Sequence, residues 1–214
     1  LLHPYKDPSL TKAVIILDEK IDFSGAAFGG TGKSIVATAL LHVTPGITKD
    51  GKRYNPKETF VFDGIYPYTR LLYFDDVRMN FDFEEFYSLI TGGLIVNRKY
   101  KNSATIPFEL SPKLLITSNY MVVGSGGPTD TRRRIEFEIY PYYSESKRPV
   151  NEFGYNFFTD WNSKEWQLFD NLMMRFIQFY LRNGIVDPPQ INLKENRLSV
   201  TTHYEFVIFM DNTI

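Results

Sequence analysis

The sequence contains no cysteine among its 214 residues. This absence excludes disulfide bonds, thiolate zinc sites and a cysteine nucleophile, and it suits a protein of the reducing cytoplasm. Only three histidines are present, His3, His42 and His203, and no spacing typical of metal ligands links them. No apolar run approaches the roughly 20 residues that a membrane-spanning helix requires, so we expect a soluble protein without membrane contact.

An excess of charge of one sign is also missing, because 24 lysines and arginines face 25 aspartates and glutamates. A near-neutral chain is not drawn to polyanions by its total charge, although local basic clusters can still bind nucleic acid. Aromatic residues are abundant, with 18 phenylalanines and 14 tyrosines. This composition indicates one globular domain, or one domain with an appendage. Since the chain starts with leucine and not methionine, we expect it to be a segment of a longer protein.

Short apolar runs predict the strands of a mostly parallel sheet. The segments with this character are residues 13–17, 60–62, 71–74, 114–117 and, with alternating polarity, 134–140. Fully apolar strands are typical of parallel sheets whose two faces are covered by helices. A buried helix is predicted at residues 33–42, ended by Pro45-Gly46. Strands interspersed with helices indicate an α/β fold.

Two further elements are predicted between the later strands. Asp82 followed three positions later by Glu85 predicts a capped helix over residues 83–91. Residues 94–100 and 104–109 flank a turn sequence, which predicts a β-hairpin.

The pattern changes beyond Pro141, where apolar residues recur at three- and four-residue spacing. These residues are Trp166, Phe169, Leu172, Met173, Phe176, Ile177, Tyr180 and Leu181. They predict a helix over residues 163–182 whose apolar stripe packs against the core. We therefore divide the chain into a core (residues 1–140), a helical extension packed on it (residues 141–187) and a connector (residues 188–214).

Residues 27–34 stand in the frame GxxxxGK[ST] of a phosphate-binding loop, with Ala27 in place of the first glycine. Glycines let backbone N–H groups surround phosphate oxygens, and the helix that follows adds its positive N-terminal end. The residues that we expect to bind ATP are Gly29, Gly30, Thr31, Gly32, Lys33 and Ser34. Lys33 would reach the β and γ phosphates, and the Ser34 hydroxyl would ligate Mg²⁺. The alternative is a glycine-rich surface turn before a helix.

Polar side chains follow two of the predicted strands. Asp75 and Asp76 end the strand at residues 71–74, and Asn119 follows the strand at residues 114–117. Ligands collect at the carboxyl ends of parallel strands, so we expect Asp75 to hold Mg²⁺ and Asp76 to position and deprotonate the attacking water. Asn119 could orient that water or sense the γ-phosphate. The alternatives are two solvated acids that cap a turn and an asparagine in a turn.

Five ordered motifs resemble the helicase domain of superfamily-three helicases, and among these most resemble the primase-helicase proteins of phages and other mobile elements. They are GGTGKS (29–34), LLYFDD (71–76), LITGGLIVNRKYK (89–101), KLLITSN (113–119) and RRRI (132–135). The resemblance covers residues 10–140. It implies an AAA+ type P-loop ATPase that assembles as a ring, usually a hexamer, and translocates on single-stranded DNA. Ala27 departs from the pattern of this family.

The resemblance also implies roles for basic residues. Arg133 and Arg134 match the pair that supplies an arginine finger, a cation that a neighbouring subunit adds to the ATP site. The family's DNA-touching hairpin matches Arg98, Lys99, Tyr100 and Lys101. Cations interleaved with an aromatic ring suit phosphate contact and base stacking, and on a strand Arg98 and Tyr100 would share one face. The alternatives are a solvated hairpin tip and a solvated arginine edge.

We therefore expect an ATP-driven DNA helicase motor that uses ATP and Mg²⁺, binds single-stranded DNA and assembles with further copies of itself. A primase domain is a candidate neighbour on the same chain. The second hypothesis is a P-loop ATPase switch, or a DNA-loading or packaging ATPase, without unwinding activity. The third is a binding module on a decayed P-loop fold, supported by Ala27 and by the long spacer of about ten residues before the loop.

Overall fold

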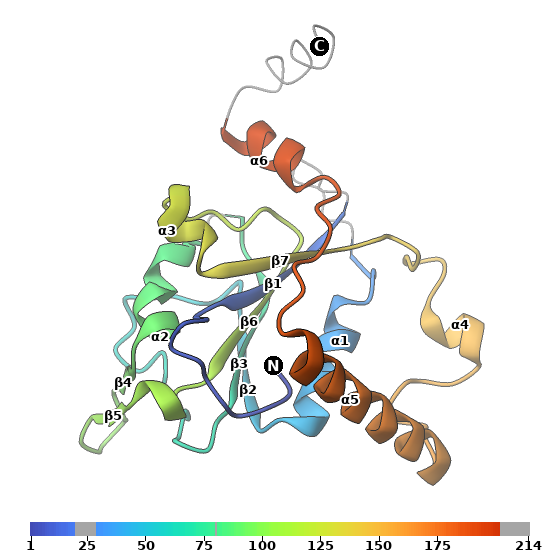
Figure 1. Ribbon diagram of the computed structural model, residues 1–214, viewed down its shortest axis with the longest axis horizontal. Helices are drawn as coiled ribbons and strands as arrows, with labels where there is room; N and C mark the ends of the chain where they lie inside the picture. The colour runs from blue at the N-terminus through green and yellow to red at the C-terminus, as the bar shows by residue number, and fades with distance from the viewer. Residues whose placement is uncertain (20–28, 80, 202–214) are drawn as a thin grey trace, which may run out of the picture.

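The computed structural model describes residues 1–19, 29–79 and 81–201 (Figure 1). Its centre is a five-stranded sheet with the order β2-β3-β6-β1-β7, in which every neighbouring pair is parallel. The strands are β1 (Ala13–Asp18), β2 (Gly46–Asp50), β3 (Leu71–Val77), β6 (Lys113–Ser118) and β7 (Arg134–Ile139). The predicted α/β fold with a mostly parallel sheet is confirmed.

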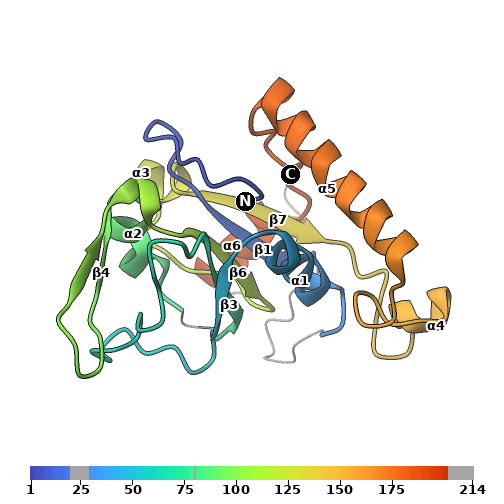
Figure 2. The ribbon, with the colours of Figure 1, turned by 90° about the horizontal axis from the view of Figure 1, so that it is seen from below.

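Helices lie on both sides of this sheet. The longer ones are α1 (Lys33–Val43), α5 (Ser163–Asn183) and α6 (Leu193–Thr201), and the short ones are η1 (Phe83–Phe86), α2 (Tyr87–Thr91), η2 (Phe108–Leu110), α3 (Gly127–Thr131) and α4 (Pro149–Phe153). In both ribbon views the sheet separates α2 from α1 and α5 (Figure 1 and Figure 2). No helix among the described residues is long and apolar enough to cross a membrane.

Alternation along β3 builds two cores from one strand. Leu72 and Phe74 belong to the larger cluster on one face, whereas Leu71 and Tyr73 belong to a smaller cluster with Ala37 of α1. In the larger cluster the rings of Tyr54, Phe74, Phe81 and Phe86 lie with centroids 4.9 to 5.7 Å apart. These four rings therefore pack between the sheet and η1.

The second strand is not where the sequence analysis placed it. Residues 60–62 form turns, and Phe60 is 47% exposed, so the predicted strand there is wrong. The edge strand is β2, whose exposure alternates along its length and which lacks an apolar run. Gly46 follows Pro45 and is the first residue of β2. A larger residue would not fit at this position, because its Cβ atom would lie 2.4 Å from the Leu41 side chain. The prediction that α1 is buried is also wrong, since only Lys33 and Ala37 of this helix are buried.

The element predicted at residues 83–91 is η1 followed by α2, and the Asp82 carboxylate caps it by accepting from the Glu84 N–H at 2.9 Å. The predicted hairpin is confirmed as β4 (Leu94–Val96) and β5 (Ala104–Ile106), which pair antiparallel with Leu94 opposite Ile106. Both strands are shorter than predicted. Residues 97–103 therefore form a loop, and the expectation that Arg98 and Tyr100 share one strand face is wrong.

The bounds of α5 confirm the long helix, but its apolar stripe is only partly packed. Phe169 and Met173 are buried, whereas Leu172, Phe176 and Leu181 are 46%, 51% and 74% exposed, so the prediction that the whole stripe packs against the core is wrong. Aromatic contacts attach the helix: His42 of α1 lies 4.9 Å from Trp166, and His3 stacks on Tyr180 at 4.7 Å. Within the predicted connector the structure has α6, whose Leu193 is buried in the larger core.

Candidate functional site

The sheet order brings three polar strand ends together. Because β6 lies between β1 and β3, the carboxyl ends of these strands meet at one edge of the sheet. They carry Asp18, the pair Asp75 and Asp76, and Asn119. Lys33 reaches the same edge from the first turn of α1. Ligands of open parallel sheets bind at such an edge, so this is the candidate site.

Lys33 is the centre of a buried network at this edge. Its ammonium donates to Asp18 Oδ2 at 2.5 Å and to Asn119 Oδ1 at 2.7 Å, and the Thr31 hydroxyl donates to Asp18 Oδ1 at 2.5 Å. Lys33 is 8% and Asp18 1% exposed. The sequence analysis did not single out Asp18. It ends an apolar strand as Asp75 does, so the same signal could have found it.

The glycines of the predicted phosphate loop adopt backbone conformations that other residues avoid. Gly30 has φ +86° and Gly32 has φ +109°, and Gly32 precedes α1 as its N-terminal cap. The first turn of α1 contains no acidic residue, and no side chain of the described residues caps it. An anion at this end would therefore meet N–H groups of the first turn and the positive end of the helix dipole. Ala27, the departure from the motif, lies outside the described residues.

Ser34 and Asp75, the predicted magnesium ligands, meet through Tyr73. The Tyr73 hydroxyl donates to Asp75 Oδ1 at 2.5 Å and also interacts with the Ser34 hydroxyl. Burial, followed by the hydrogen bond to Asp75, raises the pKa of Tyr73, so this phenol stays protonated and can donate. No group of three or more histidine or acidic side chains suited to a metal occurs among the described residues. Mg²⁺ commonly takes one or two protein oxygens with nucleotide phosphates, and Ser34 and Asp75 fit that mode.

Asp76 is held in an unusual conformation between two donors. Its φ of +50° is rare for a residue with a side chain. Lys52 Nζ lies 2.5 Å from Asp76 Oδ2, and Asn119 Nδ2 donates to Asp76 Oδ1 at 2.8 Å. The hydrogen bond to Asp76 raises the pKa of Lys52. Lys52 follows the edge strand β2, and no sequence signal links it to Asp76.

A cleft of about 950 Å³ opens beside the predicted phosphate loop. One wall is the loop and one side of α1, including Gly30, Ser34 and His42. The opposite wall comes from residues 144–159, including Arg148 and Phe158. This volume lies at the upper end of the range for small-molecule sites. The segment after Pro141, which the sequence analysis treated as a packed extension, therefore borders the predicted nucleotide site.

The two candidate finger arginines have different surroundings. Arg134 is buried, forms ion pairs with Asp130 at 2.6 Å and Glu136 at 3.1 Å, and donates to a backbone carbonyl. Arg133 is partly exposed, and its guanidinium lies over the Tyr87 ring at 4.7 Å. Arg134 is therefore occupied inside the molecule, and Arg133 is the more accessible of the two.

Both arginines lie far from the phosphate loop of their own chain. Arg134 pairs with Ala13 at the start of β1, whereas Asp18 at the end of β1 contacts Lys33. The start and the end of β1 are five residues apart in the strand, which corresponds to about 16 Å. Neither arginine thus approaches the Lys33 network of the same chain.

Replacing Arg134 by alanine is expected to lower the free energy of unfolding by about 3 kcal/mol, because Asp130 and Glu136 would lose a buried partner. The matched control is Arg133→Ala, for which we expect less than about 1 kcal/mol, since that side chain has no ion pair among the described residues. Urea unfolding measures both. Equal losses for the two variants would contradict the buried role of Arg134.

The predicted DNA-binding residues lie in the hairpin loop and are not equivalent. Lys99, Tyr100 and Lys101 are exposed, Tyr100 by 93%. The Arg98 side chain is only 12% exposed, and it donates to the Ile65 carbonyl at 3.0 Å. Three of the four residues are thus free to meet a ligand, whereas Arg98 joins the hairpin loop to the chain before β3.

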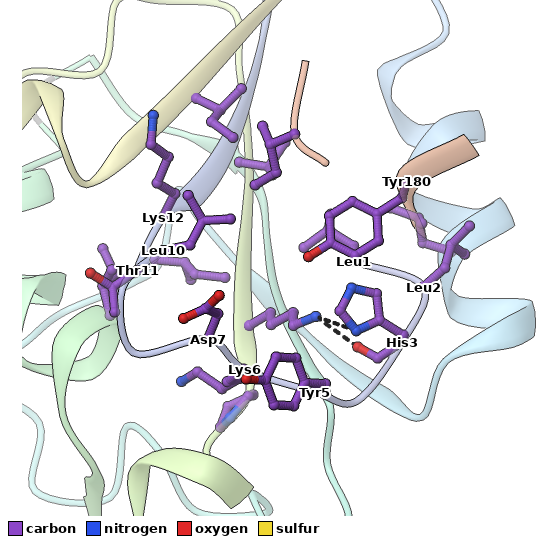
Figure 3. A pocket seen from close by; sticks show the side chains of 18 of the residues that line it. Leu1, Leu2, His3, Tyr5, Lys6, Asp7, Leu10, Thr11, Lys12 and Tyr180 are labelled. Atoms are coloured by element: carbon purple, nitrogen blue, oxygen red, sulfur yellow. Dashed lines mark hydrogen bonds between the residues drawn. The ribbon is translucent and has the colours of Figure 1, made fainter. Parts of the chain in front are cut away.

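A second cavity, of about 370 Å³, lies at the amino ends of the strands and contains none of the predicted site residues (Figure 3). The N-terminal segment and α5 line it, with the Lys113 ammonium donating to the His3 carbonyl at 2.7 Å. Burial lowers the pKa of Lys113 to about 8, and burial together with the charge of Lys113 lowers that of Lys6 to about 8.

Replacing Lys113 by methionine is expected to raise the melting temperature at pH 7 by about 2–4 °C. The folded chain binds this proton less tightly than the unfolded chain, so the penalty is complete below pH 8 and disappears as the pH rises towards 10.5. The gain over the wild type should therefore shrink between pH 8 and pH 10.5. Melting curves across this range check it, with Lys164→Met on α5 as the exposed control. A gain that does not change with pH would contradict the prediction.

No known protein family and no curated protein matches this sequence. The solved structures that match in three dimensions include two described as A-form apo structures of the C-terminal region of NrS-1. They have TM-scores of 0.41 and 0.40, and each is 18% identical over 77% of this chain and 34% of the NrS-1 chain. The chain thus spans about a third of the length of the NrS-1 chains that it matches.

Proposed function

We propose that the chain is the motor domain of an ATP-dependent DNA helicase, a P-loop ATPase that translocates on single-stranded DNA. One observation carries the proposal: Lys33, Asp18, Asp75, Asp76 and Asn119 converge at one edge of the sheet, beside a cleft large enough for a nucleotide. A lysine at a helix N-terminus with carboxylates on neighbouring strand ends is the chemistry of phosphoryl transfer.

The residues divide the work of hydrolysis as follows. Lys33 and the N–H groups of the loop bind the β and γ phosphates. Ser34 and Asp75 would hold Mg²⁺, which would neutralise charge on those phosphates. Asp76 orients the attacking water and accepts its proton, and the Asn119 amide, already hydrogen-bonded to both Lys33 and Asp76, positions these groups relative to one another.

Completion of the site requires a second copy of the chain. Arg133 is partly exposed but lies at the opposite end of the strands from Lys33, so it can act only on a neighbour's nucleotide. A cation supplied in this way stabilises the charge that develops on the transferred phosphoryl group. The proposal therefore includes a homo-oligomeric ring, with the exposed hairpin loop as the DNA-contacting element.

The second candidate function is an ATPase switch, or a DNA-loading ATPase, without unwinding activity. The ion pair between Lys52 and Asp76 favours it, because Asp76 Oδ2 lies against the Lys52 ammonium and is not free to accept a proton from water until that pair is broken. A protein that hydrolyses ATP only after this ion pair is broken would act as a switch between two states.

The test is ATP hydrolysis with Mg²⁺, with and without single-stranded DNA, at several protein concentrations. A motor with shared sites should be stimulated by DNA, and its turnover should rise faster than linearly with protein concentration. Nucleotide binding with flat turnover that does not respond to DNA would favour the switch. A folded protein that binds no nucleotide would contradict the motor and the switch. The third hypothesis, a binding module on a decayed P-loop fold, would then be favoured.

A further inference from the structure

Two neighbouring tyrosines lie exposed in the chain between β2 and β3. The rings of Tyr66 and Tyr68 are stacked, with centroids 5.3 Å apart and planes within 4° of parallel. Tyr66 is 37% and Tyr68 66% exposed. None of the five motifs includes this segment. Parallel rings that leave a face open to solvent provide a surface on which a further planar group can stack.

Contacts with Arg98 attach this pair to the hairpin loop. The Arg98 guanidinium lies 4.3 Å from the centre of the Tyr66 ring, and Asp63 lies 4.0 Å from Arg98. The Lys99 N–H also donates to the Asp63 carboxylate, at 3.5 Å. The tyrosine pair and the hairpin loop are therefore one continuous surface, which we call the tyrosine platform: Tyr66, Tyr68, Arg98, Lys99, Tyr100 and Lys101.

The cations of this surface are available for an anionic ligand. Lys99 and Lys101 are exposed and form no ion pair among residues 1–19, 29–79 and 81–198. Lys99 lies 5.5 Å from the Tyr100 ring, which is itself almost fully exposed at the tip. Free ammonium groups next to open aromatic faces match a ligand that alternates negative charges with planar rings.

We propose that the tyrosine platform binds single-stranded DNA, with a base stacked on Tyr68 and the adjoining phosphates facing Lys99 and Lys101. A base inside a duplex has both faces covered by its neighbours, so only an unpaired strand can use the exposed ring. Arg98 is a positioning residue, since its guanidinium fixes Tyr66 beneath Tyr68 and its own exposure is low. The inference rests on the proposed function, because it specifies where and in what form DNA is bound.

Fluorescence anisotropy with a labelled oligothymidine tests the platform. Tyr68→Ala should weaken binding about 10-fold, the size expected of one stacked base, and Tyr68→Phe should bind as the wild type does. The matched control is Tyr140→Ala, which removes a ring of similar exposure (65%) after β7. Circular dichroism checks that each variant is folded.

Salt titration separates stacking from charge. Lys101→Ala should reduce the slope of log affinity against log salt by about 0.7, the value for one phosphate contact on a single strand, whereas Tyr68→Ala should leave the slope unchanged. If Lys101→Ala lowered the affinity for oligothymidine and Tyr68→Ala did not, the tyrosine platform would be overturned and the proposed function would stay intact. Wild-type protein that binds no oligothymidine would overturn both. If Tyr68→Ala lowered the affinity for duplex DNA as much as the affinity for oligothymidine, the assignment to single strands would be overturned.

Discussion

Lys33→Ala is expected to reduce ATP hydrolysis at least 100-fold, to the background of the assay. The Lys33 ammonium donates to Asp18 at 2.5 Å and Asn119 at 2.7 Å, and more weakly to the Thr31 hydroxyl at 3.4 Å, so its third proton can turn to a phosphate oxygen. Its loss removes the buried cation at the first turn of α1, while the triphosphate retains its full negative charge. Phosphate release in the presence of Mg²⁺ and single-stranded DNA measures the effect.

The same change also leaves the buried Asp18 carboxylate without its ion pair, which by itself costs stability. The double variant Asp18→Asn, Lys33→Met removes both charges, so it should melt closer to the wild type and still lack activity. Lys164→Ala, an exposed lysine on α5, is the matched control and should hydrolyse ATP normally. Wild-type turnover in Lys33→Ala would contradict the assignment of this lysine and with it the phosphate loop.

The sheet shows which strands a sequence can specify. β1, β3 and β6 lie in the interior of the sheet, where both faces are covered, so their positions follow from continuous apolar runs. The edge strand β2 reads GITKD and carries no such run. Residues 60–62 have higher intrinsic strand preference, yet Val61 and Phe62 pack on the large core from a series of turns. Tertiary packing overrides local preference there.

The candidate site was predictable where its residues end interior strands. Asp75, Asp76 and Asn119 follow apolar runs, and the parallel sheet places such ends together. Lys52 was not predictable, because its contact with Asp76 depends on how the edge strand pairs and leaves no local pattern. Sequence alone places a polar residue near a site only when the element that carries it is itself recognised.

The arginines illustrate a second limit. A run of three arginines indicates a solvated edge or a functional patch, but not which side chain points inward. Along β7 the buried positions are polar, Arg134, Glu136 and Glu138, whereas the apolar Phe137 is 46% exposed. This reverses the usual alternation, because Glu136 pairs with Arg134 and Arg197, and Glu138 accepts from the backbone N–H groups of residues 191 and 192. Only the structure therefore distinguishes Arg133 from Arg134.

Asp76→Asn is expected to reduce ATP hydrolysis at least 100-fold and to leave nucleotide affinity within about threefold of the wild type. The amide keeps an oxygen to accept from Asn119 or Lys52 but cannot take a proton from water. A fluorescent ATP analogue measures binding, and phosphate release measures turnover. Asp75→Asn should differ, because weakening the proposed magnesium ligand would raise the Mg²⁺ concentration needed for half-maximal activity.

Asp187→Asn is the matched control for Asp76→Asn, since the Asp187 carboxylate is 82% exposed and far from Asp76 in the sequence. It should hydrolyse ATP as the wild type does. If Asp76→Asn retained full turnover while Asp75→Asn lost it, the proton would be taken by Asp75, and Asp76 would serve only to hold Lys52 and Asn119. The left-handed backbone at Asp76 argues that Asp76→Asn loses turnover, because a strained residue persists where the fold fixes it, and here the fold fixes Asp76 against the Asn119 amide.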